Sequence, residues 1–201
     1  MKEEIILAAK NYIRDLFAGN AGGHDAAHTL RVAALAEKIL AEERSADREK
    51  VLLGALLHDA DDAKLFSGEG NPNARAFLAE QGITGAKAEE ICEIINGVSF
   101  SKNRGRRPAS LEGKIVQDAD RLDAMGAVGI ARTFAYGGEH GRPMEESVQH
   151  FHDKLLLLKD EMNTEAGKRM AEERHAFLLE FLRRYEEETG LSGENRTEQA
   201  N

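Results

Sequence analysis

The segment VLLGALLHD, residues 51–59, organises the rest of this chain, because seven residues without a polar side chain lead directly into His58 and Asp59. Such a continuous apolar run is typical of an element buried on most sides, and Asp47 before it can cap a helix. A buried, ionised carboxylate costs several kcal/mol unless it is paired or binds a metal. The two polar residues are therefore either a hydrogen-bonded pair in the core or part of a site.

The composition limits what kind of protein this chain can be. Its 201 residues suffice for one domain with a sizeable core, and 41% of them are hydrophobic. The net charge of −9 disfavours nucleic-acid polymers and anionic membranes as partners. The N-terminus lacks a long apolar run, so we expect a cytoplasmic protein without a membrane span. The single cysteine, Cys92, excludes a disulfide framework and a cysteine-based zinc site. The sequence leaves the oligomeric state open, a homodimer included.

Apolar residues recur at helical spacing along most of the chain, and no segment shows the sustained alternation of a strand. Predicted helices include residues 3–18 and a long helix over residues 143–162. Asn71-Pro72 can open another, with the asparagine as cap and the proline in the first turn. The sequence thus predicts an all-α, single-domain chain over residues 1–188, followed by a polar tail over residues 189–201.

A second histidine lies on the apolar face of another predicted helix. Asp25 can cap this helix, in which His28 continues the spacing of Val32, Leu35 and Ile39. His28 therefore points toward the core, where His58 is available to meet it.

Three aspartates lie within one amphipathic helix that Ser110 can cap. Asp118 and Asp120 are two residues apart, so they point roughly 200° from each other around the helix. One of them can face a buried site, but hardly both, and Asp123 is the third candidate. The small apolar residues 127–136 are predicted to continue as helix up to the glycines that follow.

The polar residues on these three apolar helices form a mixed set of nitrogen and oxygen ligands. The set is His28, the His58-Asp59 pair and one aspartate from residues 118–123. Such a set suits Mn²⁺, Fe²⁺, Co²⁺, Ni²⁺ or Zn²⁺. Four protein ligands in an octahedron leave two positions for water and a substrate oxygen, which is the arrangement for metal-assisted hydrolysis.

Three segments, in this order along the chain, resemble the motifs of the HD-domain phosphohydrolases. GHDAAHTLRV at residues 23–32 resembles the first motif, LLHD at residues 56–59 the signature dipeptide, and ADRLDA at residues 119–124 the final-aspartate motif. Residues 114–136 are similar to a bacterial subgroup of small stand-alone members, some of which are nucleoside-triphosphate pyrophosphohydrolases. The resemblance covers about residues 5–185 and implies a helical bundle with a metal in a central cleft.

The resemblance also implies a ligand set: His28, His58, Asp59 and Asp120. Mn²⁺ is the metal we expect first, with Mg²⁺, Fe²⁺, Co²⁺, Ni²⁺ or Zn²⁺ as alternatives.

Further residues are expected to act around the metal. Asp62 follows His58 by one turn if the helix continues, so it is the candidate for positioning or deprotonating the attacking water. His24 is an alternative proton relay. A basic loop supplies candidate cations, although by composition alone it is equally typical of a solvated surface. The residues expected to bind substrate phosphates are Arg31, Lys102, Arg104, Arg106 and Arg107.

The expected function is hydrolysis of nucleoside triphosphates to monophosphate and pyrophosphate. A phosphomonoesterase or cyclic-nucleotide phosphodiesterase on the same site is one alternative, and a non-catalytic metal- or nucleotide-binding regulator is another. The complete ligand set with further carboxylates beside it favours an enzyme, because a pure binder needs no base.

Overall fold

The structure is a computed structural model that describes residues 2–19, 25–62, 65–66, 68–99, 103 and 105–190. Every regular element among these residues is a helix, so the predicted all-α class is confirmed. No described helix has both the length and the apolar character of a membrane span. The elements are α1 (Lys2–Leu16), α2 (Ala26–Leu40), α3 (Arg48–Leu57), α4 (Pro72–Glu80), α5 (Gly85–Val98), α6 (Leu111–Asp123), α7 (Gly126–Glu139), α8 (Met144–Asp153), the 3-10 helix η1 (Leu155–Glu161) and α9 (Glu165–Thr189).

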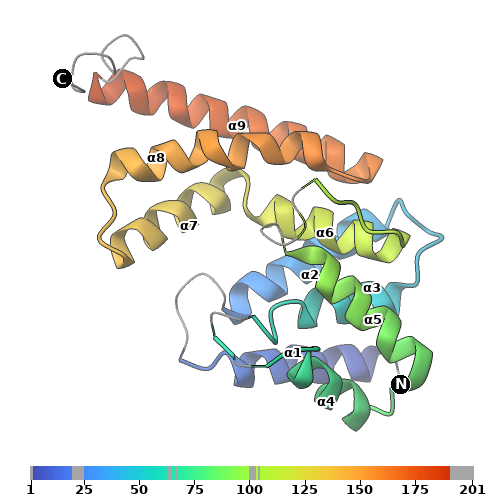
Figure 1. Ribbon diagram of the computed structural model, residues 1–201. Helices are drawn as coiled ribbons and strands as arrows, with labels where there is room; N and C mark the ends of the chain where they lie inside the picture. The colour runs from blue at the N-terminus through green and yellow to red at the C-terminus, as the bar shows by residue number, and fades with distance from the viewer. Residues whose placement is uncertain are drawn as a thin grey trace.

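Helix α6 joins two groups of helices (Figure 1). In the first group α2, α3 and α5 pack against α6, while α1 lies on α3 and α4 lies on α5. In the second group α9 packs on both α6 and α7, and α8 lies beside α7. Helices α2, α3 and α6 therefore contact one another around one core. Of the predicted metal ligands, α2 carries His28, α6 carries Asp120, and His58 and Asp59 directly follow α3.

Helix α3 is the centre of the first group. The side chains of Val51, Leu52, Leu53, Leu56 and Leu57 are at most 1% exposed. Burial of each such side chain contributes roughly 1.5–3 kcal/mol. A Cβ added at position 54 would lie 2.6 Å from Cγ2 of Ile94, so the glycine there lets α3 and α5 approach closely.

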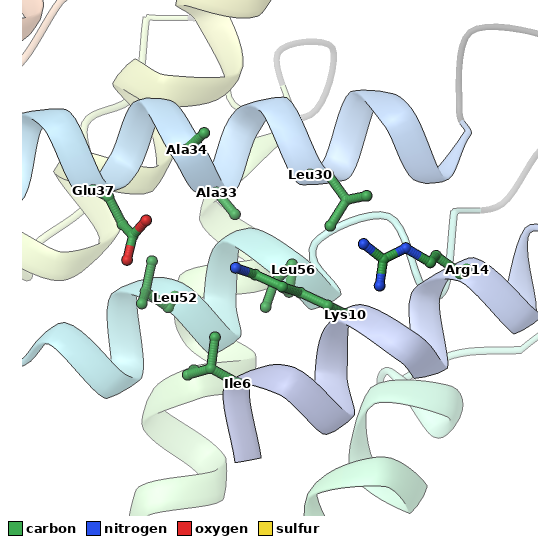
Figure 2. A pocket seen from close by; sticks show the side chains of 9 residues that line it. All are labelled: Ile6, Lys10, Arg14, Leu30, Ala33, Ala34, Glu37, Leu52 and Leu56. Atoms are coloured by element: carbon green, nitrogen blue, oxygen red, sulfur yellow. The ribbon is translucent and has the colours of Figure 1, made fainter. Parts of the chain in front are cut away.

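Helix α1 packs mainly on α3 and less on α2. A cavity of about 190 Å³ lies between these three helices (Figure 2). It is separate from the predicted metal ligands, none of which lines it.

Three of the predicted helix caps are present. Asp25, Asp47 and Ser110 each accept a hydrogen bond from a backbone N–H in the first turn of the helix that follows. These caps depend on neighbours in sequence, which is why sequence alone can predict them.

Asn71 occupies the predicted cap position of α4, but its side chain does not cap the helix. Its backbone is left-handed, with φ of 61°, and its side chain makes no capping hydrogen bond. The first turn of α4 is instead capped from a distance by Asp61, whose carboxylate accepts from the N–H groups of Asn73 at 2.8 Å and Ala74 at 3.0 Å. Pro72 occupies the first turn, as predicted.

Two predicted helix extents are also wrong. The helix expected over residues 143–162 breaks at Lys154, with φ of −140° and ψ of −58°, and continues as the 3-10 helix η1. A spacing of three residues fits a 3-10 helix as well as an α-helix, so the apolar pattern could not separate the two kinds of helix.

Residues 127–136 do not continue α6, since the chain turns at Gly126, with φ of 67°. Helix α7 then runs past Gly137, where an added Cβ would lie 2.4 Å from Oγ of Ser147 in α8. The predicted domain end at residue 188 falls in the last turn of α9, and residues 191–201 lie outside the described part.

Candidate metal centre

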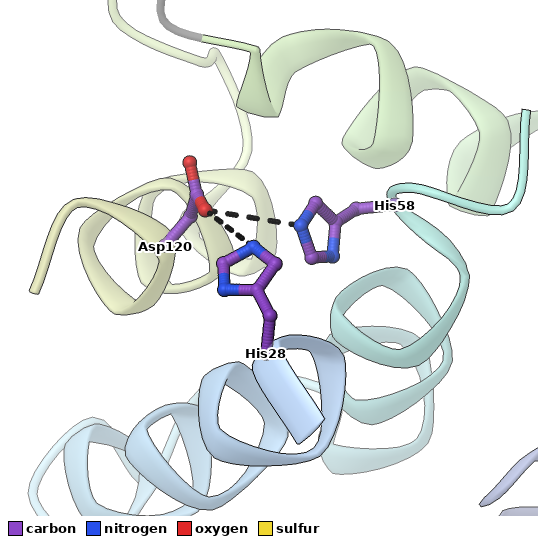
Figure 3. A group of neighbouring side chains, drawn as sticks. All are labelled: His28, His58 and Asp120. Atoms are coloured by element: carbon purple, nitrogen blue, oxygen red, sulfur yellow. Dashed lines mark ion pairs between the residues drawn. The ribbon is translucent and has the colours of Figure 1, made fainter. Parts of the chain in front are cut away.

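Three helices bring polar residues to one point. His28 lies in the first turn of α2, His58 is the residue that ends α3, and Asp120 lies in the last turn of α6. Figure 3 shows their side chains pointing toward one another. One ligand atom from each of the three lies within 4.8 Å of the other two.

The fourth predicted ligand, Asp59, contacts both imidazoles. Nε2 of His28 lies 3.5 Å from Oδ2 of Asp59 and 3.3 Å from Oδ1 of Asp120. Nε2 of His58 lies 3.4 Å from Oδ1 of Asp59 and 3.8 Å from Oδ1 of Asp120. The structure therefore gathers all four residues that the sequence predicted as metal ligands.

The two ring nitrogens of His58 have different surroundings. Nδ1 lies 2.8 Å from the carbonyl oxygen of Ala55, so it carries the proton and donates it. In the neutral ring Nε2 then carries the lone pair, and among the described residues this buried atom has no hydrogen-bond partner. A buried polar atom without a partner is costly, and a neutral imidazole nitrogen is a common metal ligand. Two imidazoles and two carboxylates fit a divalent transition metal.

The sequence reasoning missed how Asp123 is used. This carboxylate is 1% exposed and lies 2.7 Å from Nδ1 of His28. It also accepts from Nε of Arg31 at 2.7 Å, from Nη2 of Arg31 at 3.0 Å and from Nη1 of Arg132 at 2.6 Å. When Nδ1 of His28 donates to Asp123, its Nε2 is left to face Asp59 and Asp120. Asp123 thus fixes the ring that holds the ligand atom.

The charges around His28 oppose the effect of its burial on its pKa. Burial disfavours the charged ring, but the carboxylates of Asp120 and Asp123 raise the pKa of His28 to about 9. Burial works against ionisation of Asp120 as well, yet His28 and His58 hold its pKa below the usual value. The pKa of Asp123 is also well below its usual range, because hydrogen bonds from His28 and Arg31 outweigh burial. The carboxylates around His28 therefore strongly favour a positive charge among them.

Asp118 lies on another face of α6 and takes no part in this cluster. It is fully buried. Its oxygens accept from the backbone N–H groups of Asn163 and Thr164, each at 2.8 Å, and from both of their side chains. Burial raises the pKa of the Asp118 carboxyl against the effect of these donors. The expectation that only one of Asp118 and Asp120 faces the site agrees with these contacts.

The expectation for Asp62 rested on a helix that does not exist. Helix α3 ends at Leu57, and the residues after His58 form turns instead of another helical turn. The backbone N–H of Asp62 donates to the carbonyl oxygen of Asp59 at 3.1 Å, so the two residues are adjacent across a turn. His24, the alternative proton relay, lies outside the described residues.

The candidate phosphate-binding cations are only partly described. Lys102 and Arg104 lie outside the described residues, while Arg106 and Arg107 are exposed. The side-chain amide of Gln117 donates to the carbonyl oxygens of Gly97 at 2.8 Å and Arg106 at 3.3 Å, so it holds this loop against α6. Gln117 precedes Asp120 by one helical turn.

Arg31 lies beside the site, but its guanidinium is engaged by Asp123. Arg132, which the sequence analysis did not single out, shares that carboxylate. One sequence signal pointed toward it, since Arg132 is the one charged residue among the small and apolar residues 127–136.

Comparisons with known proteins agree with this geometry. The model of the HD domain family matches residues 25–125, which include all four clustered residues. The uncharacterized protein YpgQ of Bacillus subtilis is 40% identical over 188 residues, which cover 89% of this chain and 91% of that protein. The uncharacterized protein L803 of Acanthamoeba polyphaga mimivirus is 32% identical over 132 residues, or 58% of this chain and 54% of that protein.

Solved structures show the same fold. The crystal structure of YpgQ in complex with ADP superimposes with a TM-score of 0.78 and 36% identity, and covers 93% of this chain and 96% of that chain. An HD-superfamily hydrolase from Bacillus thuringiensis has a TM-score of 0.78 and 36% identity, with 96% of this chain and 100% of that chain covered.

Proposed function

Since the chain belongs to the HD-domain family, we propose that it is a metal-dependent phosphohydrolase that converts nucleoside triphosphates to monophosphates and pyrophosphate. The observation that carries the proposal is the buried Nε2 of His58, which has no hydrogen-bond partner in the described part of the chain and faces Asp59 and Asp120 beside a second imidazole. His28, His58, Asp59 and Asp120 would hold the metal ion, with Mn²⁺ as the first candidate. A divalent ion held there would activate water and polarise a phosphoryl oxygen.

The residues around the ligands have separate roles in this proposal. Asp123 holds the ring of His28, and Asp62 remains the proposed group for positioning or deprotonating the attacking water, because it is adjacent to Asp59. His24 stays the proposed alternative. These roles belong to general acid–base catalysis, in which the group must reach the proton that it transfers.

A nucleotide substrate is supported by one comparison and by the charges near the site. The crystal structure of YpgQ contains ADP. In this chain Arg31 lies at the site, and Gln117 holds the backbone of Arg106 against α6. Arginine binds phosphates through paired N–H groups. The proposed phosphate-binding set is Arg31, Lys102, Arg104, Arg106 and Arg107.

The proposed bond depends on which phosphates these cations hold. If they hold the terminal phosphates, the α-phosphorus is left nearest to the clustered ligands, and pyrophosphate becomes the leaving group. A nucleoside monophosphate and pyrophosphate are then the products.

Product identification tests the proposal. The purified protein is incubated with Mn²⁺ and each nucleoside triphosphate, and the products are separated by chromatography with parallel detection of phosphate and pyrophosphate. We expect monophosphate and pyrophosphate in equal amounts. Stepwise release of single phosphates would replace this activity with that of a phosphomonoesterase. Metal and nucleotide binding without turnover would instead indicate a regulator.

A further inference from the structure

The cavity between α1, α2 and α3 is shown in Figure 2, and helix geometry places it on another side of α2 than the metal cluster. Leu30 lines the cavity and follows His28 by two residues, which is roughly 200° around the helix. The floor is apolar, since Ile6, Ala33, Leu52 and Leu56 line it and are at most 4% exposed. A ligand in this cavity would therefore not compete for the residues of the metal cluster.

Two cationic side chains, Lys10 and Arg14, lie at one side of this apolar lining. Lys10 and Arg14 are one turn apart on α1, and Figure 2 shows both head groups pointing into the space between the helices. Arg14 donates to the side-chain oxygen of Asn11 at 3.0 Å. Among the described residues, neither Lys10 nor Arg14 forms an ion pair. This is unexpected in a chain with a net charge of −9.

The acidic residue at the cavity does not neutralise them. Glu37 also lines the cavity, but its carboxylate accepts from Nη2 of Arg48 at 2.6 Å. Arg48 also pairs with Glu3 at 2.7 Å, so Glu3, Glu37 and Arg48 together carry one negative charge. With Lys10 and Arg14 the net charge at the cavity is one positive, above a surface that water solvates poorly. Such a surface complements a molecule with an anionic head and an apolar body.

We propose that this cavity binds a small amphipathic anion, a carboxylate or phosphate head on a short alkyl chain or a single ring. The volume sets the size of the ligand. An apolar cavity of roughly 150 Å³ accommodates benzene, and sites for drug-sized molecules begin near about 300 Å³. At about 190 Å³ the cavity admits a body of one ring or a short chain, and a nucleotide is too large for it.

The test is an NMR titration of the full-length protein with hexanoate. We expect saturable shifts of backbone amides along α1 and α2 at the cavity, with a dissociation constant on the order of 1 mM. Hexanol has the same chain without the charge and should bind at least about tenfold more weakly. Hexylammonium carries the opposite charge and should give no saturable shifts.

Three variants separate the cations from the cavity itself. Lys10→Gln combined with Arg14→Gln should weaken hexanoate binding by about tenfold while binding of hexanol stays unchanged. Ala34→Leu keeps both cations but places a larger side chain at the exposed lining position, and it should remove binding of both ligands. Lys38→Gln changes an exposed cation of α2 that does not line the cavity, so it should leave binding unchanged. Equal affinity for hexanol and hexanoate, an unchanged affinity in the double variant, or no saturable shift with hexanoate would each overturn the proposal.

Discussion

Two faces of the same helix, α6, each carry an aspartate and use it differently. Asp118 is surrounded by donors, since two backbone N–H groups and two side chains of residues 163 and 164 point at its oxygens. Asp120 faces two imidazoles and comes close to a second carboxylate, Asp59. A carboxylate that is satisfied by donors ties α9 to α6. A carboxylate that lies close to another acid depends on positive charge beside it, which here comes from the imidazoles and would come from a bound metal ion.

Asp120→Asn tests the face of α6 that belongs to the metal cluster, and we expect the largest effect from it. The amide removes a ligand charge but keeps the shape, so bound Mn²⁺ and nucleotide hydrolysis should both fall below detection. The thermal midpoint of the metal-free protein should change little, because the apolar side of α6 is untouched. Metal analysis, a turnover assay and a melting curve measure the three quantities. Retained metal would place Asp120 outside the site.

Asp123→Asn should have the next largest effect. The amide keeps only one acceptor oxygen, so it no longer balances the charges of Arg31 and Arg132 or favours the tautomer of His28 with the proton on Nδ1. Metal affinity should fall by about 10- to 100-fold, as is typical when a partner of a ligating histidine is removed. Isothermal titration with Mn²⁺ measures this, and Asp123→Glu serves as the variant that keeps the charge. An unchanged affinity in the asparagine variant would mean that Asp123 only fills space.

Asp118→Asn tests the other face of α6. Its amide presents donors to the N–H groups of Asn163 and Thr164, so the protein should lose about 1–3 kcal/mol of unfolding free energy. Metal affinity should stay within about twofold of the wild type, because the site contacts are on the other face. Denaturant unfolding and the same Mn²⁺ titration give both numbers. A metal affinity that falls as far as in Asp123→Asn would show that the two faces are not separate.

The smallest effect is expected from Gly167→Ala in α9. The added Cβ would lie 2.4 Å from Oδ2 of Asp118 and 2.9 Å from Oγ1 of Thr164, so these atoms must shift. Crowding of this kind costs about 1–3 kcal/mol, partly offset by the gain of up to about 1 kcal/mol for alanine over glycine in a helix. We expect a net loss of about 1 kcal/mol with unchanged metal binding, measured by denaturant unfolding. An increase in stability would mean that the Asp118 contacts tolerate displacement.

The sequence predicted the features that depend on neighbouring residues. The caps at Asp25, Asp47 and Ser110 follow from a side chain next to its own helix, and the placement of Asp118 and Asp120 on different faces follows from helical geometry. The cap of α4 could not be predicted, because Asp61 reaches it from another part of the chain.

The same limit applies to the site. His28, His58, Asp59 and Asp120 could be named from apolar faces and motif resemblance, and the structure brings them together. The joint use of Asp123 by His28, Arg31 and Arg132 depends on how α2, α6 and α7 pack, which no local pattern encodes. The end of α3 at Leu57 likewise removed the helical argument for Asp62.

The most direct test of the account is to measure how many Mn²⁺ ions bind to the wild-type protein and to His58→Ala, by electron paramagnetic resonance of free Mn²⁺ during a titration. His58 is the informative residue because no described residue forms a hydrogen bond with its buried Nε2. We expect one tightly bound ion per wild-type chain and none in His58→Ala, with Asp118→Asn retaining the ion as the matched control. One tightly bound ion in His58→Ala, with wild-type affinity, would contradict this expectation.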